Sequence, residues 1–270
     1  CLQPLPYQVI MSHQSSAPAN PANAPSARFF PDIGLAANMR VLDVGCGNGD
    51  LSRMIAALVG PNGEVVGIDR SEGALASARA VPPRPESALI RYQTTDLSGA
   101  LPDLGLFDAI VGRRVLMYLP DAAATLTRLA TLSKPGTILA FQEHARADLP
   151  SAANDIPVHR QCYGMMWDTV AAEKGDVTLG YRLADLVRAA GFTIEHARSE
   201  GVLIQSWEES FLPTLARVML PRMIEHGVAR AGEVDLNALA LSIDEEHRAA
   251  NGTIFWDLAF LVSGRFESVV

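Results

Sequence analysis

Three aspartates stand at the ends of three predicted strands, and their placement suits the binding of a nucleoside. Asp43 lies in the apolar run 41–44, Asp69 ends the run 64–69, and Asp96 follows the run 89–94. Such runs predict buried parallel strands, whose carboxyl ends meet at the edge of the sheet where α/β proteins bind ligands. Asp69 comes 20 residues after Gly49 (69 − 49), a position from which a carboxylate accepts hydrogen bonds from a ribose diol.

The glycine turn after the first strand argues against a dinucleotide. Gly45, Gly47 and Gly49 alternate, and from position 51 apolar residues recur every three or four positions, which predicts a helix directly after the turn. The dinucleotide fingerprint would need glycine at position 50, where this chain has Asp50. Acids at positions 43 and 50 also disfavour a phosphate at the start of that helix and favour a positively charged ligand.

The stretch Val-Leu-Asp-Val-Gly-Cys-Gly-Asn-Gly, residues 41–49, resembles motif I of the class I S-adenosylmethionine-dependent methyltransferases, and later segments resemble that family in order. The resemblance implies an α/β fold with a Rossmann-like, seven-stranded, mostly parallel sheet and an antiparallel last strand. It implies S-adenosyl-L-methionine as methyl donor and S-adenosyl-L-homocysteine as product. The residues that it assigns to cofactor binding, together with Asp69, are Asp43, Gly45, Cys46, Gly47, Gly49, Arg70, Asp96, Leu97 and Arg113.

The predicted elements form one domain over residues 28–270, preceded by a flexible tail over residues 1–27 that is rich in proline and small residues. Two stretches, at about 145–180 and 206–251, depart from the minimal fold and are expected to cover the substrate end of the sheet. In the second, Ser206 and Glu209 have the spacing of a capping box at a helix start. Predicted strands are 41–44, 64–69, 89–94, 107–111, 137–142, 192–197 and 258–265, and predicted helices begin near 51, 73, 121, 182, 206 and 235.

Candidates for catalysis and acceptor binding follow from position and side-chain type. His144, just past the fifth strand, is the candidate general base, with a hydrogen-bonded structural histidine as the alternative. Tyr118, after the fourth strand, is a candidate wall of the active site. A carboxylate acceptor would need no base. Candidate acceptor-binding residues in the two covering stretches, for which core or dimer packing is the alternative, are His159, Tyr163, Trp167, Trp207 and Phe211.

The composition of the chain argues against several classes of binding partner. A net charge of −8 with no basic run argues against a nucleic acid, and no stretch reaches the roughly 20 apolar residues of a membrane span. Three cysteines without metal-site or disulfide spacing fit a reducing compartment, so we expect a cytoplasmic protein. His159 and Cys162 lack the further ligands of a zinc site, so no metal is expected. A homodimer is an open alternative.

The resulting hypothesis is methyl transfer to a small, partly hydrophobic metabolite, with O- or C-methylation favoured. Residues 38 to 200 are similar to the ubiquinone and menaquinone biosynthesis type of methyltransferase and its natural-product relatives, which places the activity in quinone-like or secondary metabolism. Two alternatives stay open. A nicotinamide-dependent oxidoreductase is opposed by Asp50, the glycine spacing and Asp96. A regulatory protein that binds the cofactor without catalysis would keep the three aspartates but lack an open acceptor pocket.

Overall fold

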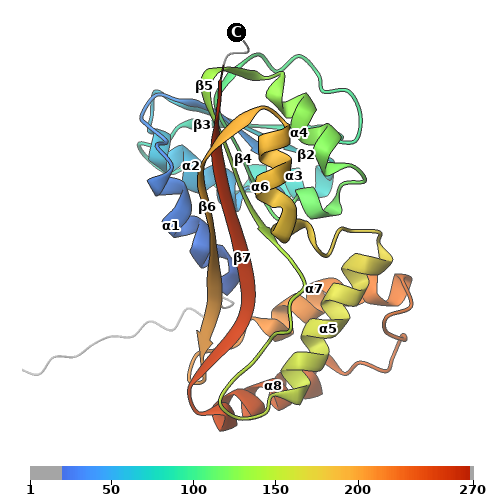
Figure 1. The fold of residues 1–270 in the computed structure, drawn as a ribbon. Coiled ribbons are helices and arrows are strands. Elements are labelled where there is room, and N and C mark those ends of the chain that lie inside the picture. Colours follow the sequence, from blue (N-terminus) through green and yellow to red (C-terminus); the bar gives the residue numbers. More distant parts are fainter. Residues whose placement is uncertain (1–19, 268–270) are drawn as a thin grey trace, which may run out of the picture.

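Seven strands form a single sheet in the order β3-β2-β1-β4-β5-β7-β6 (Figure 1). The computed structural model describes residues 20–267. β1 to β5 pair in parallel, and β7 lies antiparallel between β5 and β6. This confirms the predicted mostly parallel sheet with an antiparallel last strand. The strands are β1 (Arg40–Val44), β2 (Glu64–Asp69), β3 (Leu89–Thr94), β4 (Phe107–Arg113), β5 (Ser133–His144), β6 (Phe192–Gln205) and β7 (Thr253–Phe266).

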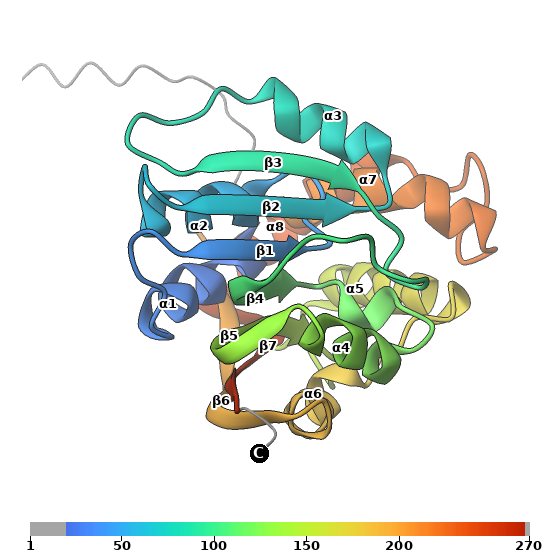
Figure 2. The same cartoon turned by 90° about the horizontal axis from the view of Figure 1, so that it is seen from above.

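Helices cover both faces of the sheet (Figure 2). On one face α1 and α2 bury Phe29, Phe30 and Ile55 against β1, and on the other α4 and α6 bury Leu126 and Leu183. No helix within residues 20–267 is long and apolar enough to span a bilayer. The helices are η1 (Pro21–Asn23), α1 (Ala24–Asp32), α2 (Asp50–Val59), α3 (Glu72–Ala80), η2 (Leu116–Tyr118), α4 (Ala122–Ala130), α5 (Pro157–Ala172), α6 (Leu179–Ala189), α7 (Leu212–Glu225) and α8 (Leu236–Ala250).

The N-terminal segment is helical where a flexible tail was expected to continue to residue 27. The Asn20 side chain accepts a hydrogen bond from the amide of Ala22 and caps η1, and prolines occupy the first turns of η1 and α1. Phe29 and Phe30 then bury their rings completely. The prolines that suggest disorder by composition are therefore helix starters by position. The rest of the predicted tail, residues 1–19, lies outside the described residues.

Three helices, α5, α7 and α8, lie beyond the carboxyl ends of the parallel strands, below the main sheet in Figure 1. The first belongs to the stretch 145–180 and the other two to the stretch 206–251. Glu246 of α8 accepts hydrogen bonds from the amides of Val158 and His159 at 2.7 and 2.8 Å and so caps the start of α5. This cap joins the two covering stretches, because a helix start has amides without partners inside the helix.

The predicted capping box at Ser206 is wrong. The Ser206 hydroxyl accepts from the amide of Gly252 at 3.1 Å, which closes the connection between β6 and β7, and Glu208 accepts from the amide of Gln205 at 2.9 Å. Helix α7 begins only at Leu212, followed by a proline in its first turn. The start at Leu212 leaves Trp207 in the connection before the helix.

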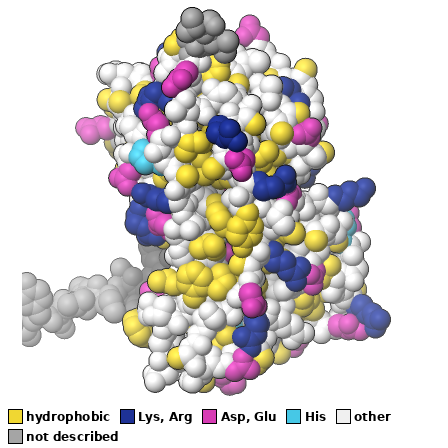
Figure 3. All heavy atoms as spheres, in the orientation of Figure 1, with side chains coloured by type: hydrophobic (Ala, Val, Ile, Leu, Met, Phe, Trp, Pro, Cys, Tyr) yellow, Lys and Arg dark blue, Asp and Glu magenta, His cyan; other side chains and the backbone are white. Residues whose placement is uncertain are grey.

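The last two strands are longer than predicted, since the pairing of β6 with β7 runs from Phe192 to Gln205. Both strands continue past the parallel strands towards the covering helices, and apolar side chains gather on the surface along them (Figure 3). β6 forms an edge of the sheet and carries charged side chains that pair with α1: Glu200 with Arg28 at 2.7 Å and Arg198 with Asp32 at 3.7 Å. Charges on an edge strand disfavour pairing with another chain.

Candidate functional site

The turn from β1 into α2 is built so that only glycine fits. Gly45 has φ +66°, and a Cβ added there would lie 2.3 Å from Cγ2 of Val115. Gly49 has φ +79° at the start of α2, and its Cβ would lie 2.3 Å from the hydroxyl of Tyr92. At Gly47, with φ +53°, an added Cβ would meet no atom within 4 Å. Space is therefore kept open beside Gly47, as expected where a ligand approaches the backbone.

Two neighbouring cavities lie at the carboxyl ends of the strands. The smaller cavity, about 380 Å³, adjoins the glycine turn, and the larger cavity, about 740 Å³, adjoins the ends of β2 and β3. Gly45, Arg114, Tyr118 and Arg222 line both of them. Of the residues predicted to bind cofactor, the smaller cavity is lined by Asp43, Gly45, Cys46, Gly47 and Arg113, and the larger by Asp69, Arg70, Asp96 and Leu97.

Asp69 ties the glycine turn to the end of β2. Its two carboxylate oxygens accept from the amides of Gly47 at 2.9 Å and Ser71 at 2.8 Å, and each oxygen keeps a second lone pair. Asp96 is exposed, and a hydrogen bond from the amide of Ser98 at 2.9 Å holds its pKa below the ordinary value. Both carboxylates face the larger cavity as hydrogen-bond acceptors, the chemistry that a ribose and an adenine amino group require.

Asp43 has a buried oxygen without a partner. Oδ2 accepts from the Ser52 hydroxyl at 2.5 Å, while Oδ1 has no partner among residues 20–267. Burial raises the pKa of Asp43 to about 7, against the hydrogen bond from Ser52, which lowers it. An orphaned buried acceptor is costly, so this oxygen beside the smaller cavity suits a ligand that brings a positive charge.

Two arginines on the smaller cavity, Arg113 and Arg114, have no ion-pair partner in the part of the chain that the structure describes. Burial lowers the pKa of Arg113 to about 10, and burial is also the main cause that lowers the pKa of Arg114. Arg114 donates from Nη2 to Oδ1 of Asn23 at 2.7 Å. Both side chains are half-buried, and a partly desolvated guanidinium without an ion-pair partner favours an anion, so these two side chains suit an anionic group in the cavity.

A third arginine on the cavities is already neutralised. Arg222 of α7 donates from Nε and Nη2 to the two oxygens of Glu173, at 2.6 and 2.5 Å. Its guanidinium lies 5.8 Å from the ring centre of Tyr118, so that predicted wall residue does border both cavities. Arg222 therefore joins α7 to the end of α5 through Glu173, and this ion pair neutralises its charge.

The far wall of the smaller cavity is apolar. It is formed by α5 and α7, and the predicted residues Tyr163 and Trp167 line it. Their rings meet edge to face at 6.3 Å. The other apolar side chains of this wall are Met166, Val170, Leu215, Val218, Met219 and Trp256.

Three residues predicted to contact the acceptor line neither cavity. His159 is fully buried, with Nδ1 2.7 Å from Nε2 of His247. Trp207 is 76% exposed in the connection before α7, and Phe211 packs against the core at the residue before the helix. Helical spacing counted from position 206 would place both aromatic rings on one face. Because α7 starts at Leu212, both rings lie ahead of the helix, and its cavity face consists of Leu215, Val218, Met219 and Arg222.

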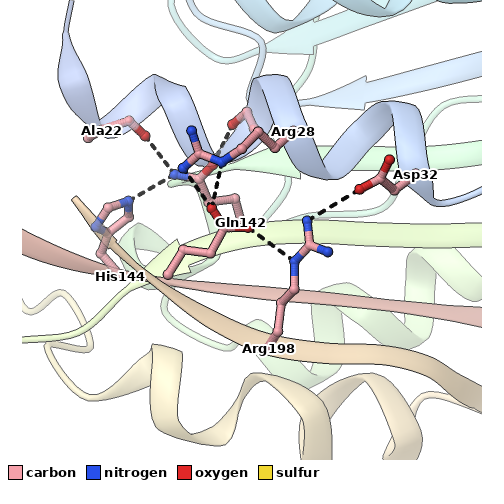
Figure 4. Close-up of polar contacts among 8 residues, drawn as sticks. Ala22, Arg28, Asp32, Gln142, His144 and Arg198 are labelled. Atoms are coloured by element: carbon pink, nitrogen blue, oxygen red, sulfur yellow. Dashed lines mark hydrogen bonds and ion pairs between the residues drawn. The ribbon is translucent and has the colours of Figure 1, made fainter. Parts of the chain in front are cut away.

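His144 lines the smaller cavity within a chain of polar contacts (Figure 4). Its Nδ1 lies 2.8 Å from Oδ2 of Asp257, and its Nε2 lies 3.0 Å from Nε2 of Gln142. Tyr163 donates to Oδ1 of the same aspartate at 3.2 Å. His144 thus has the position predicted for it, and both of its ring nitrogens are engaged.

Sequence reasoning missed four residues of this site: Arg114, Gln142, Trp256 and Asp257. Alternation along β5 was an available signal for Gln142, since it stands two residues before His144 and so shares its face of the strand. Asp257 gives no local signal, because it reaches His144 only through the antiparallel pairing of β5 with β7. Glu143, between Gln142 and His144, points to the other face, where Oε1 accepts from the amides of Val115 and Leu116.

The sequence of the chain is similar to those of known proteins. A family model described as a methyltransferase domain matches residues 35–184. A trans-aconitate 2-methyltransferase of Methylobacterium radiotolerans is 35% identical over 172 residues, 62% of this chain and 60% of that protein. A 2-phytyl-1,4-naphtoquinone methyltransferase of Synechococcus elongatus is 34% identical over 148 residues, 54% of this chain and 61% of that protein. The chain thus spans about three fifths of the length of these curated relatives.

The fold is also similar to solved structures. A phosphoethanolamine N-methyltransferase 2 of Haemonchus contortus, in complex with S-adenosyl-L-methionine, has a TM-score of 0.52 and 16% identity. The similarity covers 92% of this chain and 52% of that one. At this identity the likeness concerns the fold alone.

Proposed function

Because the chain belongs to the methyltransferase-domain family, whose model matches residues 35–184, we propose that it transfers a methyl group from S-adenosyl-L-methionine to a carboxylate oxygen of a small, partly apolar acid. The observation that carries the choice of acceptor is Arg114, which lines both cavities and has no ion-pair partner among residues 20–267. The trans-aconitate enzyme, whose printed substrate is an acid, supports the same choice.

The two cavities fit the cofactor. The larger cavity offers Asp69 and Asp96 as acceptors for the ribose and adenine, and the open space beside Gly47 lets the methionine part approach the turn. The free oxygen of Asp43 suits the ammonium group, and Arg113 suits the carboxylate group. S-adenosylmethionine supplies a methyl group on positively charged sulfur, and its transfer to a carboxylate oxygen breaks one carbon–sulfur bond, forms one carbon–oxygen bond and moves no proton.

With Arg113 assigned to the cofactor and Arg222 paired with Glu173, Arg114 is the cation left for the acceptor among residues 20–267. It lines both cavities, so it lies at the boundary between the cofactor side and the acceptor side. Arg114 and the wall of aromatic and methionine side chains together favour an acid with a single charge and an apolar body. Holding donor and acceptor in line with water excluded then accounts for much of the rate.

A quinol acceptor is the second candidate, supported by the same apolar wall and by the naphtoquinone relative. Calorimetric titration with S-adenosylhomocysteine and NAD tests the cofactor first, since binding of NAD alone would favour the oxidoreductase. A methylation assay with cinnamate, trans-aconitate, catechol and a naphthoquinol then tests the acceptor. Turnover of the quinol with none of either acid would overturn the carboxylate assignment, and cofactor binding with no turnover of any acceptor would favour the regulatory alternative.

We expect Arg114→Gln to raise the KM for a carboxylate acceptor roughly tenfold, because it removes a charge-assisted hydrogen bond to the acid. The affinity for S-adenosylhomocysteine should stay within about twofold, which also shows that the variant is folded. The matched control is Arg188→Gln on α6, where the arginine is exposed and pairs with Asp185. An unchanged KM for Arg114→Gln would contradict the role of this arginine.

Two tryptophan variants test the acceptor wall. Trp167 is buried against the smaller cavity, so Trp167→Ala should raise the acceptor KM by about tenfold or more through lost apolar contact. Trp207 is exposed and lines neither cavity, so Trp207→Ala should leave that KM unchanged. Steady-state kinetics on both variants give the comparison, and a large effect at Trp207 would return that residue to the acceptor site.

A further inference from the structure

Gln142 connects the N-terminal helical segment to the histidine of the smaller cavity (Figure 4). It is fully buried on β5, between Ala22 and Ser26 on one side and His144 on the other. We propose that Gln142 is a positioning residue that holds His144 in one neutral tautomer and so prevents it from acting as a general base. The proposal deepens the proposed function, because it explains why the acceptor must arrive already ionised.

The partners of the Gln142 side chain fix which end is the amide nitrogen. The atom that faces the carbonyl oxygen of Ala22 lies 2.8 Å from it, and a carbonyl only accepts, so this atom must be Nε2. The hydroxyl of Ser26 donates to the opposite end, Oε1. Ser26 is also fully buried, so water does not compete for these contacts. If the amide rotated by half a turn, Oε1 would face the carbonyl oxygen of Ala22, and neither atom could donate a hydrogen bond.

The orientation of that amide then determines the proton of His144. Nδ1 lies 2.8 Å from Oδ2 of Asp257, a carboxylate oxygen that accepts, so Nδ1 carries the hydrogen. Nε2 lies 3.0 Å from Nε2 of Gln142, which donates, so this ring nitrogen is the acceptor. Asp257 is itself held, because Oδ1 accepts from the amide of Leu258 at 2.8 Å and from the hydroxyl of Tyr163.

This network resembles a general base oriented by a carboxylate. However, the lone pair on Nε2 of His144 already accepts the hydrogen bond from Gln142. A hydroxyl acceptor must lose a proton during methyl transfer, and the atom of His144 able to take it is Nε2. While Gln142 donates to Nε2, a proton added there would face the amide hydrogens. A carboxylate needs no such step, so Gln142 acts on specificity: it favours acceptors that are already anions over hydroxyl compounds.

The tautomer can be measured without any methyl transfer. Long-range ¹H–¹⁵N correlation spectra of the full chain at neutral pH should show His144 with a protonated Nδ1 and an unprotonated Nε2. In Gln142→Glu, a carboxylate replaces the amide donor, so both nitrogens should become protonated. The matched control is Gln93→Glu at an exposed position on β3, which should leave the His144 signals unchanged. A proton on Nε2 in the wild-type chain, or identical ring signals in Gln142→Glu, would overturn the proposal.

The effect on specificity is a second, independent readout. Gln142→Leu removes the donor from Nε2, so the rate with catechol relative to the rate with cinnamate should rise about 100-fold, the lower end of the range for a general base. S-adenosylhomocysteine titration shows whether the variant is folded. An unchanged ratio in a variant that binds the cofactor product would contradict the specificity role. The spectra decide the tautomer even if neither acceptor is methylated, so failure of the proposed function and failure of this inference are distinguishable.

Discussion

Replacing Asp69 by Ala should lower the affinity for S-adenosylhomocysteine about 100-fold, because two to three kcal/mol is typical when hydrogen bonds to a charged group are lost. Asp69 holds the amides of Gly47 and Ser71, so the substitution removes the ribose acceptor and also loosens the glycine turn. Calorimetric titration of the purified chain gives the affinity directly. Asp69→Asn keeps one acceptor oxygen and should show a smaller loss.

The control for this variant is Asp103→Ala. Asp103 likewise accepts from a backbone amide, that of Gly105, but in an exposed loop away from both cavities. Its loss should leave the affinity unchanged. His144→Ala should also spare cofactor binding, because the contacts of His144 are on the acceptor side. An equal loss of affinity in Asp69→Ala and His144→Ala would contradict the division of the site into two ends.

The free energy of unfolding should fall by about 2 kcal/mol more in the wild-type chain than in a His159→Gln/His247→Gln double variant when the pH is lowered from 7 to 5. Burial, with the neighbouring His247, lowers the pKa of His159 from 6.5 to about 3, and burial also lowers that of His247. Below pH 6.5 the unfolded chain therefore binds protons that the folded chain cannot. Stability from this pair is present above pH 6.5 and is lost as the pH falls.

Urea unfolding at both pH values measures the difference between the two proteins. The comparison is needed because two buried acids act in the opposite direction: burial raises the pKa of Asp43 and of Glu143 to about 7, which reduces stability as the pH rises towards 7. Both acids are present in wild type and variant, so their contribution cancels. His196→Gln, which alters a half-buried histidine on β6, is the control. Parallel pH profiles for wild type and double variant would contradict the assignment.

The methyltransferase class and the core of the fold were predictable because their signals are local. Strands β1, β2 and β4 are mainly apolar runs with sharp boundaries, and the glycine spacing with Asp50 and Asp96 indicates a site other than a dinucleotide site. The family match and the curated relatives confirm the class. The parts of β6 after residue 197 and of β7 before residue 258 were not predictable. Burial along β6 alternates irregularly, and the length of this strand depends on its pairing with β7.

The acceptor side was predicted only in part, for a physical reason. Tyr163, Trp167 and His144 have positions that follow from spacing near a strand end. Trp207 and Phe211 line neither cavity because the contacts after β6 leave both residues ahead of α7, which begins at Leu212, and no pattern of one helix reveals that. Gln142 contacts Ala22, and Asp257 contacts His144. Each contact joins segments that are far apart in the sequence, so no local pattern predicts it.

The place of β7 in the sheet has a consequence for synthesis of the protein on the ribosome. β6 pairs with no strand except β7 within residues 20–267, and β7 comes after α7 and α8 in the chain. A nascent chain that has emerged as far as α8 therefore has the parallel strands in order but leaves β6 without a partner and β5 with a free edge. Since domains generally fold as units, we expect the sheet to become stable only after β7 has emerged and paired with both strands. Asp257, which orients His144, arrives with the strand that closes the sheet, so the acceptor side is completed last.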